Sequence, residues 1–133
     1  MDYLPIFADV RGRLCLVVGG GEVARRKAGV LLEAGARVRV VAPEIVPALA
    51  EQQRVETVIA RFEVQHLDGM ALVIAATNDR GVNRQVSEMA RARNIPVNVV
   101  DDPGLCSFIM PAILDRSPLM VAFSSGGASP VLT

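Results

Sequence analysis

Apolar and polar positions follow two different patterns along the chain. Five short runs are apolar enough to be expected as buried strands: 14–18, 38–41, 55–60, 72–76 and 96–100. Between them, apolar positions recur at helical spacing in three stretches: 22–34, 44–53 and 80–93. Continuous apolar strands are typical of a parallel sheet, because both sides of each strand are then buried. The pattern therefore predicts an α/β protein with a parallel sheet and helices on both faces.

The pattern changes after the fifth apolar run. Two apolar stretches, 108–114 and 119–123, are joined by the polar residues 115–118 and predict an antiparallel β-hairpin. Ser129-Pro130 then has the form of a helix N-cap followed by the first helical residue, and the sequence ends before that helix. We therefore expect two parts, a domain over residues 1–113 and the truncated start of a dimerisation segment over residues 114–133.

A glycine-rich turn connects the first apolar run to the first helical stretch. Its spacing, Gly19-x-Gly21-x-x-Ala24, is the one required where a strand turns into a helix that holds a dinucleotide pyrophosphate. Gly19 allows the tight turn, Gly21 leaves room for the phosphates, and the small Ala24 lets the helix pack on the strand. The backbone N–H groups of Gly21, Glu22 and Val23 are expected to face the anion. The motif predicts a Rossmann-like NAD-binding domain, and the alternative is a glycine turn without a ligand.

Residues after the second and fourth strands complete the predicted cofactor site. Pro43 and Glu44 lie about 20 residues beyond the glycine motif, where a ribose-binding acid is expected. The acid usually found at the very end of the second strand is absent, so either Glu44 or backbone groups would bind the ribose. No arginine follows Pro43 to meet a 2′-phosphate, which favours NAD over NADP. Thr77 and Asn78 are expected to lie near the nicotinamide half.

The overall composition argues against several classes of function. The 133 residues suffice for one domain with its own core, and their formal net charge is +0 at pH 7. A neutral chain with 4% aromatic residues and no tryptophan is unlike a nucleic-acid-binding or membrane-surface protein. The apolar runs are too short to span a bilayer, and the N-terminus lacks the pattern of a signal peptide. Since two cysteines make no disulfide framework, we expect a cytoplasmic location.

Several further motifs follow one another in a specific order. Together with the glycine motif they are Leu4-Pro5-Ile6-Phe7, Ala75-Ala76-Thr77-Asn78-Asp79, Asn98-Val99-Val100-Asp101, Ser107-Phe108-Ile109-Met110-Pro111 and residues 115–132. In this order they resemble the siroheme synthase family, over its module with precorrin-2 dehydrogenase and sirohydrochlorin ferrochelatase activities. The resemblance implies that NAD accepts a hydride from precorrin-2 to give sirohydrochlorin. Ferrous iron, as a substrate, then enters the macrocycle with loss of two pyrrole protons, and the choice between iron and cobalt stays open.

Asp101 is the candidate catalytic residue. It follows the fifth strand, at the edge where open α/β sheets place their ligands. Both implied reactions need a group that removes protons, which a carboxylate at the edge of the site can do. The resemblance also assigns the proposed catalytic aspartate of the family to Asp101. The alternative is a solvated aspartate that only caps the strand end.

The remaining polar candidates carry weaker signals. Arg116, in the predicted hairpin turn, is expected to pair with carboxylates of the polyanionic tetrapyrrole, unless it is an ordinary surface arginine. Ser124 and Ser125 belong to a loop that suits an anion-binding nest, a lid or a phosphate acceptor.

No cluster of cysteine and histidine with metal-ligand spacing is present, so no resident metal is expected. His66 is interpreted as a surface residue, Cys15 as a core residue, and Cys106 as a residue near Asp101 that could approach an incoming metal.

Two other functions stay open alongside the enzyme. A nucleotide-sensing regulatory module would use the same glycine motif and would need neither Asp101 nor the hairpin. An assembly fragment would act mainly by dimerisation. A symmetric homodimer through residues 108–133 is expected in any case, because the apolar hairpin lacks a packing partner.

Overall fold

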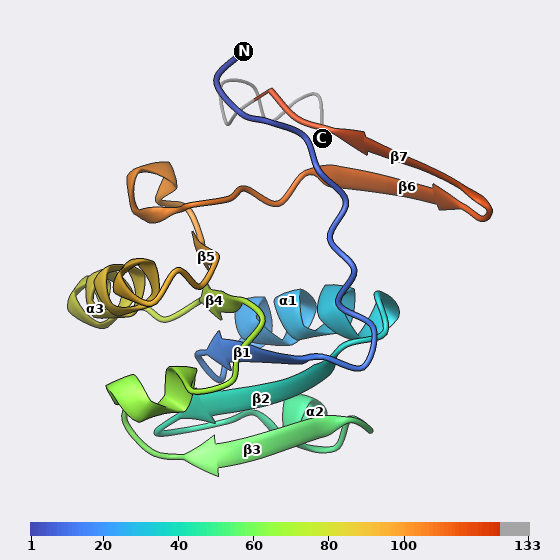
Figure 1. The fold of residues 1–133 in the computed structure, drawn as a ribbon. Coiled ribbons are helices and arrows are strands. Elements are labelled where there is room, and N and C mark those ends of the chain that lie inside the picture. The colour runs from blue at the N-terminus through green and yellow to red at the C-terminus, as the bar shows by residue number, and fades with distance from the viewer. Residues whose placement is uncertain (126–133) are drawn as a thin grey trace.

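The computed structural model describes residues 1–125. Five strands form one parallel sheet in the order β3-β2-β1-β4-β5 (Figure 1). Their bounds are Leu14–Val18 (β1), Arg37–Ala42 (β2), Val55–Ile59 (β3), Val73–Ala75 (β4) and Val97–Val99 (β5). The predicted Rossmann-like parallel sheet is confirmed. The helix start predicted at Ser129-Pro130 lies outside the described residues.

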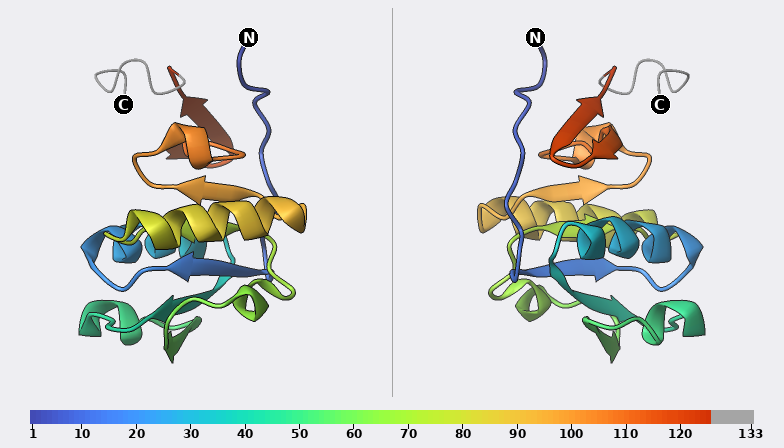
Figure 2. Two further views of the ribbon diagram at one scale, coloured as in Figure 1. Left: turned by 90° about the vertical axis from the view of Figure 1, so that its left-hand side faces the viewer. Right: turned by 90° about the vertical axis from the view of Figure 1, so that its right-hand side faces the viewer.

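Helices cover both faces of this sheet, as predicted. One face carries α1 (Glu22–Glu33) and α2 (Pro47–Ala50), and the other carries α3 (Arg80–Ala92). Figure 2 shows α3 in front of the sheet from one side and α1 in front of it from the opposite side. The crossover from β1 to β2 through α1 and the crossover from β4 to β5 through α3 therefore run on different faces, which opens a crevice at the carboxyl ends of β1 and β4.

Each face of the sheet has its own hydrophobic core. In β1, Cys15 and Val17 pack with residues of α1, whereas Leu16 and Val18 pack with residues of α3. This division follows from the strand geometry, since successive side chains point to opposite faces. Cys15 is fully buried, which confirms it as a core residue, and burial raises the pKa of its thiol.

The helix predicted over residues 44–53 is much shorter in the structure. Only Pro47–Ala50 is helical, because the backbone before it is engaged by the glycine turn. The N–H group of Val46 donates to the carbonyl of Gly20 at 2.8 Å, and Val46 is extended. Beyond Ala50 the chain turns, and Arg54 adopts a left-handed conformation with φ 66°. Helical spacing of apolar residues could not reveal this engagement.

The predicted antiparallel hairpin is confirmed, with its first strand shifted. It consists of β6 (Ala112–Arg116) and β7 (Leu119–Phe123), which pair with each other and not with the main sheet. The first strand was predicted over 108–114, but residues 107 and 108 are engaged along β5. The N–H group of Ser107 donates to the carbonyl of Val97 at 2.8 Å, and the amide of Asn98 donates to the carbonyl of Phe108 at 3.1 Å.

The hairpin lies outside the sheet, at the same end of the molecule as the N-terminus (Figure 1). Within residues 1–125, no helix has both the length and the apolar character needed to cross a membrane.

Candidate functional site

Three loops meet at the carboxyl edge of the sheet. The loop after β1 touches the loop after β4, since a Cβ atom added to Gly19 would lie 2.8 Å from the carbonyl carbon of Ala76. The loop after β4 is joined to that after β5, where the N–H group of Val100 donates to the carbonyl of Ala75 at 3.0 Å. This edge contains the point at which the strand order reverses, where α/β sheets bind ligands.

Two glycines of the turn are required by its backbone. Gly19 has φ 135°, which L side chains rarely adopt. A Cβ atom on Gly20 would lie 2.9 Å from both the carbonyl carbon of Glu44 and the Cα atom of Ile45, and would collide with the carbonyl oxygen of Glu44. The sequence motif left Gly20 unassigned, and the run of three glycines was the signal that it was also required. The close approach brings the backbone of Glu44 to the predicted cofactor turn.

Gly21, in contrast, faces open space. A Cβ atom added there would have no heavy atom within 4 Å, and Gly21 caps α1 without any side-chain hydrogen bond. The first intrahelical hydrogen bond runs from the N–H group of Arg25 to the carbonyl of Gly21 at 3.0 Å. The N–H groups before Arg25, including those of Glu22 and Val23, therefore have no intrahelical partner. The start of α1 is open to an anion, as the motif predicts.

The N-terminus of α3 differs from that of α1 although both lie at the same edge. The carboxylate of Asp79 accepts hydrogen bonds from the N–H groups of Gly81 at 2.9 Å and Val82 at 3.2 Å. This helix therefore carries its own anionic cap. At α1 the acidic Glu22 pairs with Arg25 at 2.5 Å, and that hydrogen bond lowers the pKa of the Glu22 carboxyl. The pairing partly offsets the charge beside the predicted phosphate site.

Asn83 holds the loop after β4 in place. Its side-chain oxygen lies 2.7 Å from the hydroxyl of Thr77, and its amide donates to the carbonyl of Thr77 at 3.1 Å. The N–H group of Asp79 donates to the same hydroxyl at 3.1 Å. Asn83 is 7% exposed, and its two bonds to Thr77 are partly buried. The conformation of the predicted nicotinamide-binding residues thus depends on a buried amide from the first turns of α3.

A cavity of about 390 Å³ lies where these loops meet. It is lined by residues from the loops after β4 and β5 and from α3: Thr77, Asn78, Arg80, Asn83, Val100, Asp101 and Asp102. The structure therefore brings the predicted catalytic Asp101 to the same cavity as the predicted nicotinamide contacts, Thr77 and Asn78. Arg80 and Asn83 were missed by sequence reasoning, and their only signal was their position in the first turns of a helix that follows this edge.

Asp101 occupies an unusual backbone conformation. Its φ angle is 63°, and the turn that contains it is closed by a hydrogen bond of 3.2 Å from the N–H group of Asp102 to the carbonyl of Val99. Positive φ at the third position of a turn favours glycine or asparagine, and aspartate there is less common. Residues held in such conformations cluster at functional sites. The side chain is exposed, which suits a group that exchanges protons with a ligand.

Comparison with known proteins assigns the chain to a family. The family described as "Putative NAD(P)-binding" matches residues 6–112. The chain belongs to this family. The matched segment contains the glycine turn, the cavity and Asp101.

Similar proteins confirm the resemblance predicted from the motifs. The siroheme synthase of Methylobacillus flagellatus is 59% identical over 135 residues, which cover 99% of this chain and 29% of that protein. The siroheme synthase of Nitrosospira multiformis is 57% identical over 140 residues, which cover 100% of this chain and 30% of that protein. The chain therefore spans under a third of the length of these relatives.

A solved structure is similar to the whole described fold. SirC, a precorrin-2 dehydrogenase, superimposes with a TM-score of 0.81 at 29% identity, over 98% of this chain and 65% of that one. Because nearly the whole chain is covered, the hairpin is part of the shared fold as well as the NAD(P)-binding sheet.

Other residues singled out from the sequence lie away from the cavity. Arg116 is exposed on β6, and its guanidinium donates to the backbone carbonyl of Asp115 at 3.1 Å. Ser124 and Ser125 follow β7. None of the three lines the cavity in a single chain, so their roles in substrate binding stay predictions.

The residues weighed as metal ligands have local contacts instead. His66, in a short 3-10 turn (Val64–Leu67), accepts a hydrogen bond from the N–H group of Glu63 at 2.9 Å. The thiol of Cys106 lies against the turn that contains Asp101. Over residues 1–125, no three side chains of histidine, cysteine, aspartate or glutamate are grouped to hold a metal ion.

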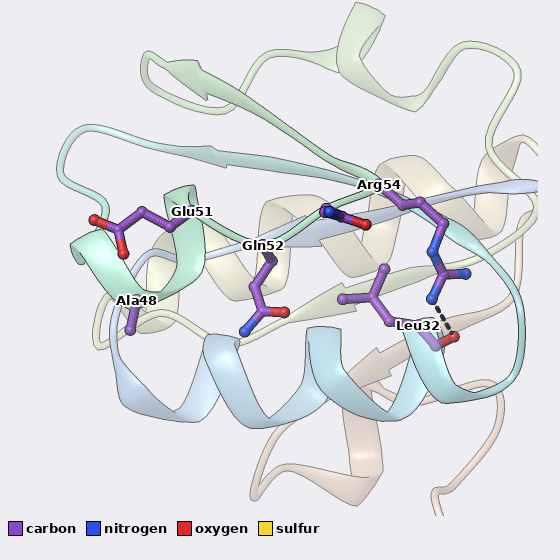
Figure 3. A pocket seen from close by; sticks show the side chains of 6 residues that line it. Leu32, Ala48, Glu51, Gln52 and Arg54 are labelled. Atoms are coloured by element: carbon purple, nitrogen blue, oxygen red, sulfur yellow. Dashed lines mark hydrogen bonds between the residues drawn. The ribbon is translucent and has the colours of Figure 1, made fainter.

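A second hollow, of about 630 Å³, lies between α1 and the segment from Ala48 in α2 to Arg54 (Figure 3). The guanidinium of Arg54 reaches from the loop before β3 and donates to the carbonyls of Leu32 at 3.0 Å and Ala36 at 3.3 Å. A cation at the C-terminal end of α1 complements the helix dipole, and its hydrogen bonds join the last turn of α1 at Leu32 to Ala36 beyond the helix. Arg54 therefore stabilises the C-terminal end of α1.

Proposed function

We propose that this chain carries the site of an NAD-dependent precorrin-2 dehydrogenase that also inserts ferrous iron into sirohydrochlorin, in siroheme biosynthesis. The observation that supports the proposal most is the cavity at the carboxyl edge of the sheet. It joins Asp101 to the residues predicted to contact nicotinamide, next to a glycine turn that is open to an anion. The similarity to siroheme synthases and to a precorrin-2 dehydrogenase supports the same reaction.

The open turn fits a dinucleotide. The N–H groups of Gly21, Glu22 and Val23 would hold the pyrophosphate, because no side chain fills the space above them. Pro43 and Glu44 would lie beside the ribose, since the backbone of Glu44 touches the glycine turn.

The charges on β2 and β3 favour NAD over NADP. The two arginines of β2 have other partners: Arg39 pairs with Glu56 at 3.1 Å, and Arg37 donates to the carbonyl of Gly12 at 3.4 Å. Neither is therefore directed to a 2′-phosphate, and the nearby carboxylate of Glu44 would repel one.

NAD, when bound, supplies the acceptor for the hydride that leaves precorrin-2. The substrate must also lose a proton, and Asp101 is placed to accept it at a carboxylate oxygen. In the second reaction two pyrrole protons leave as ferrous iron enters, and the same carboxylate would take them in turn. Arg80 would pair with a carboxylate of the polyanionic substrate, because it is the one cationic residue among those described that line the cavity.

Replacement of Asp101 by alanine tests the proposal. The purified protein is mixed with precorrin-2 and NAD, and sirohydrochlorin is followed by its absorbance; ferrous iron is then added. We expect the variant to bind NAD like the wild type, while both rates fall by roughly 10²–10⁴-fold, the usual contribution of a positioned acid–base group. Wild-type rates in the variant would show that Asp101 only ends the strand. A wild-type protein that binds NAD without converting precorrin-2 would instead favour the nucleotide-sensing module.

A cytoplasmic homodimer is part of the proposal. The hairpin exposes large apolar side chains, which are 39–65% exposed in one chain: Ile113, Leu114, Leu119, Met120 and Phe123. Such a surface is typical of an interface rather than of a monomer. Pairing of two chains through residues 108–133 would cover it, and would bring Arg116, Ser124 and Ser125 to a second subunit.

A further inference from the structure

The turn that contains Asp101 needs support from outside itself. Its third residue has φ 63°, a conformation that an aspartate adopts less readily than glycine. One backbone hydrogen bond, from the N–H group of Asp102 to the carbonyl of Val99 at 3.2 Å, closes the turn. The N–H group of Val100 also donates to the carbonyl of Ala75 at 3.0 Å, which ties the second residue of the turn to β4 but does not fix Asp101 or Asp102.

The thiol of Cys106 bridges the two ends of this turn. The N–H group of Val99 donates to the sulfur at 3.1 Å. The sulfur also lies 3.3 Å from the carbonyl of Val99 and 3.3 Å from the carbonyl of Asp102, so its single proton can be donated to either. One side chain thus contacts the first and fourth residues of the turn whose third residue is Asp101.

The segment that carries this thiol is anchored independently of the turn. The hydroxyl of Ser87 donates to the carbonyl of Leu105 at 2.5 Å, and the guanidinium of Arg91 donates to the carbonyl of Cys106 at 2.6 Å. The N–H group of Val97 donates to the hydroxyl of Ser107 at 2.9 Å. Because α3 and β5 hold residues 105–107, the thiol has a fixed base from which to restrain the turn.

We propose that Cys106 is a positioning residue for Asp101, which holds the turn from Val99 to Asp102 so that the carboxylate stays at the cavity. The expected effect on catalysis rests on the proposed function, whereas the expected effect on the structure of the turn rests on the hydrogen bonds alone. Burial raises the pKa of the Cys106 thiol, so the sulfur keeps the proton that it donates. Cys15 differs, since it is enclosed among apolar core residues.

Three variants separate positioning from general stability. Cys106→Ser keeps a donor and an acceptor, Cys106→Val is slightly larger and has no hydrogen-bonding group, and Cys15→Val is the matched control. Cys15 is also buried, but it lies on β1 among apolar core residues and not at the turn. For each variant, kcat, the KM for precorrin-2, the KM for NAD and thermal unfolding are measured, together with hydrogen exchange at the N–H group of Asp102.

We expect Cys106→Val to lower kcat for sirohydrochlorin formation by about 10–100-fold, the usual effect of a misplaced catalytic group, with the KM for NAD unchanged. Exchange at Asp102 should become faster in the same variant. Cys106→Ser should restore both properties, and Cys15→Val should lower the unfolding temperature without changing kcat, because it overpacks a fully buried position away from the turn.

Two results would overturn the proposal: a folded Cys106→Val variant with wild-type kcat and exchange, or an equal loss of kcat in Cys15→Val. If the wild type itself does not oxidise precorrin-2, the proposed function fails, whereas the exchange at Asp102 still decides whether Cys106 restrains the turn.

Discussion

Gly20 and Gly21 are adjacent, yet their replacement should have opposite consequences. In Gly21→Asp the new side chain meets open space, and aspartate is a favourable N-cap residue. The free energy of unfolding should therefore stay constant or rise by a few tenths of a kcal/mol. In Gly20→Ala the new methyl group lies 2.9 Å from two backbone carbons, well inside ordinary contact. Overpacking of this kind costs about 1–3 kcal/mol.

The affinity for NAD, in contrast, should be affected by the replacement of Gly21. A carboxylate at residue 21, placed about 5 Å from a bound pyrophosphate at an effective dielectric constant near 20, is repelled by about 3 kcal/mol for each phosphate charge. That energy corresponds to roughly two orders of magnitude in Kd. Screening at this exposed position reduces the effect, so we expect NAD to bind at least about tenfold more weakly to Gly21→Asp.

Titration calorimetry with NAD and thermal unfolding of both variants give the answer. The expected result is weak binding with a wild-type unfolding temperature in Gly21→Asp, and an unfolding temperature several degrees lower in Gly20→Ala. The reasoning is refuted if Gly21→Asp binds NAD as tightly as the wild type. It is also refuted if Gly20→Ala unfolds at the wild-type temperature, because the contact with Glu44 would then tolerate a side chain.

Two further predictions follow from exposed groups. Arg80→Gln should raise the KM for precorrin-2 by about 10-fold, as expected for loss of a charge-assisted pair, and leave the Kd for NAD unchanged. Arg84→Gln, on the same helix but outside the cavity, is the control, and equal effects of the two would contradict the assignment. Leu119→Lys should convert the proposed homodimer to monomer, since Leu119 is 65% exposed in one chain and would lie in the interface. Sedimentation velocity at micromolar concentration tests this, and a wild-type monomer would count against the proposed interface.

Features that depend on local pattern were predictable from the sequence. Apolar strands and amphipathic helices alternate with turn residues between them, and that order specifies a parallel sheet with helices on both faces. Because all carboxyl ends of a parallel sheet meet at one edge, the residues after the first, fourth and fifth strands could be expected to lie together. The glycine turn, Thr77, Asn78 and Asp101 were found this way, and the structure brings the latter three to one cavity.

Features that depend on contacts between distant segments appeared only in the tertiary structure. Gly20 is required because the backbone of Glu44, 24 positions later in the numbering, lies against it. The same contact shortens the helix predicted over 44–53, since Val46 donates to the glycine turn. The shift of the hairpin has a similar origin, because residues 107 and 108 bond to β5 before β6 begins.

The residues that hold the site in place could also be recognised only in the tertiary structure. In the sequence, Asn83 is an ordinary helix residue, and Cys106 was noted only as a residue near Asp101 that could approach an incoming metal. Their importance comes from the backbone atoms that they reach: the loop at Thr77 for Asn83, and both ends of the turn at Asp101 for Cys106. A sequence pattern shows which residues follow a strand. Which side chains hold those residues in place depends on how α3 and β5 pack beside the loops, and that is visible only in the tertiary structure.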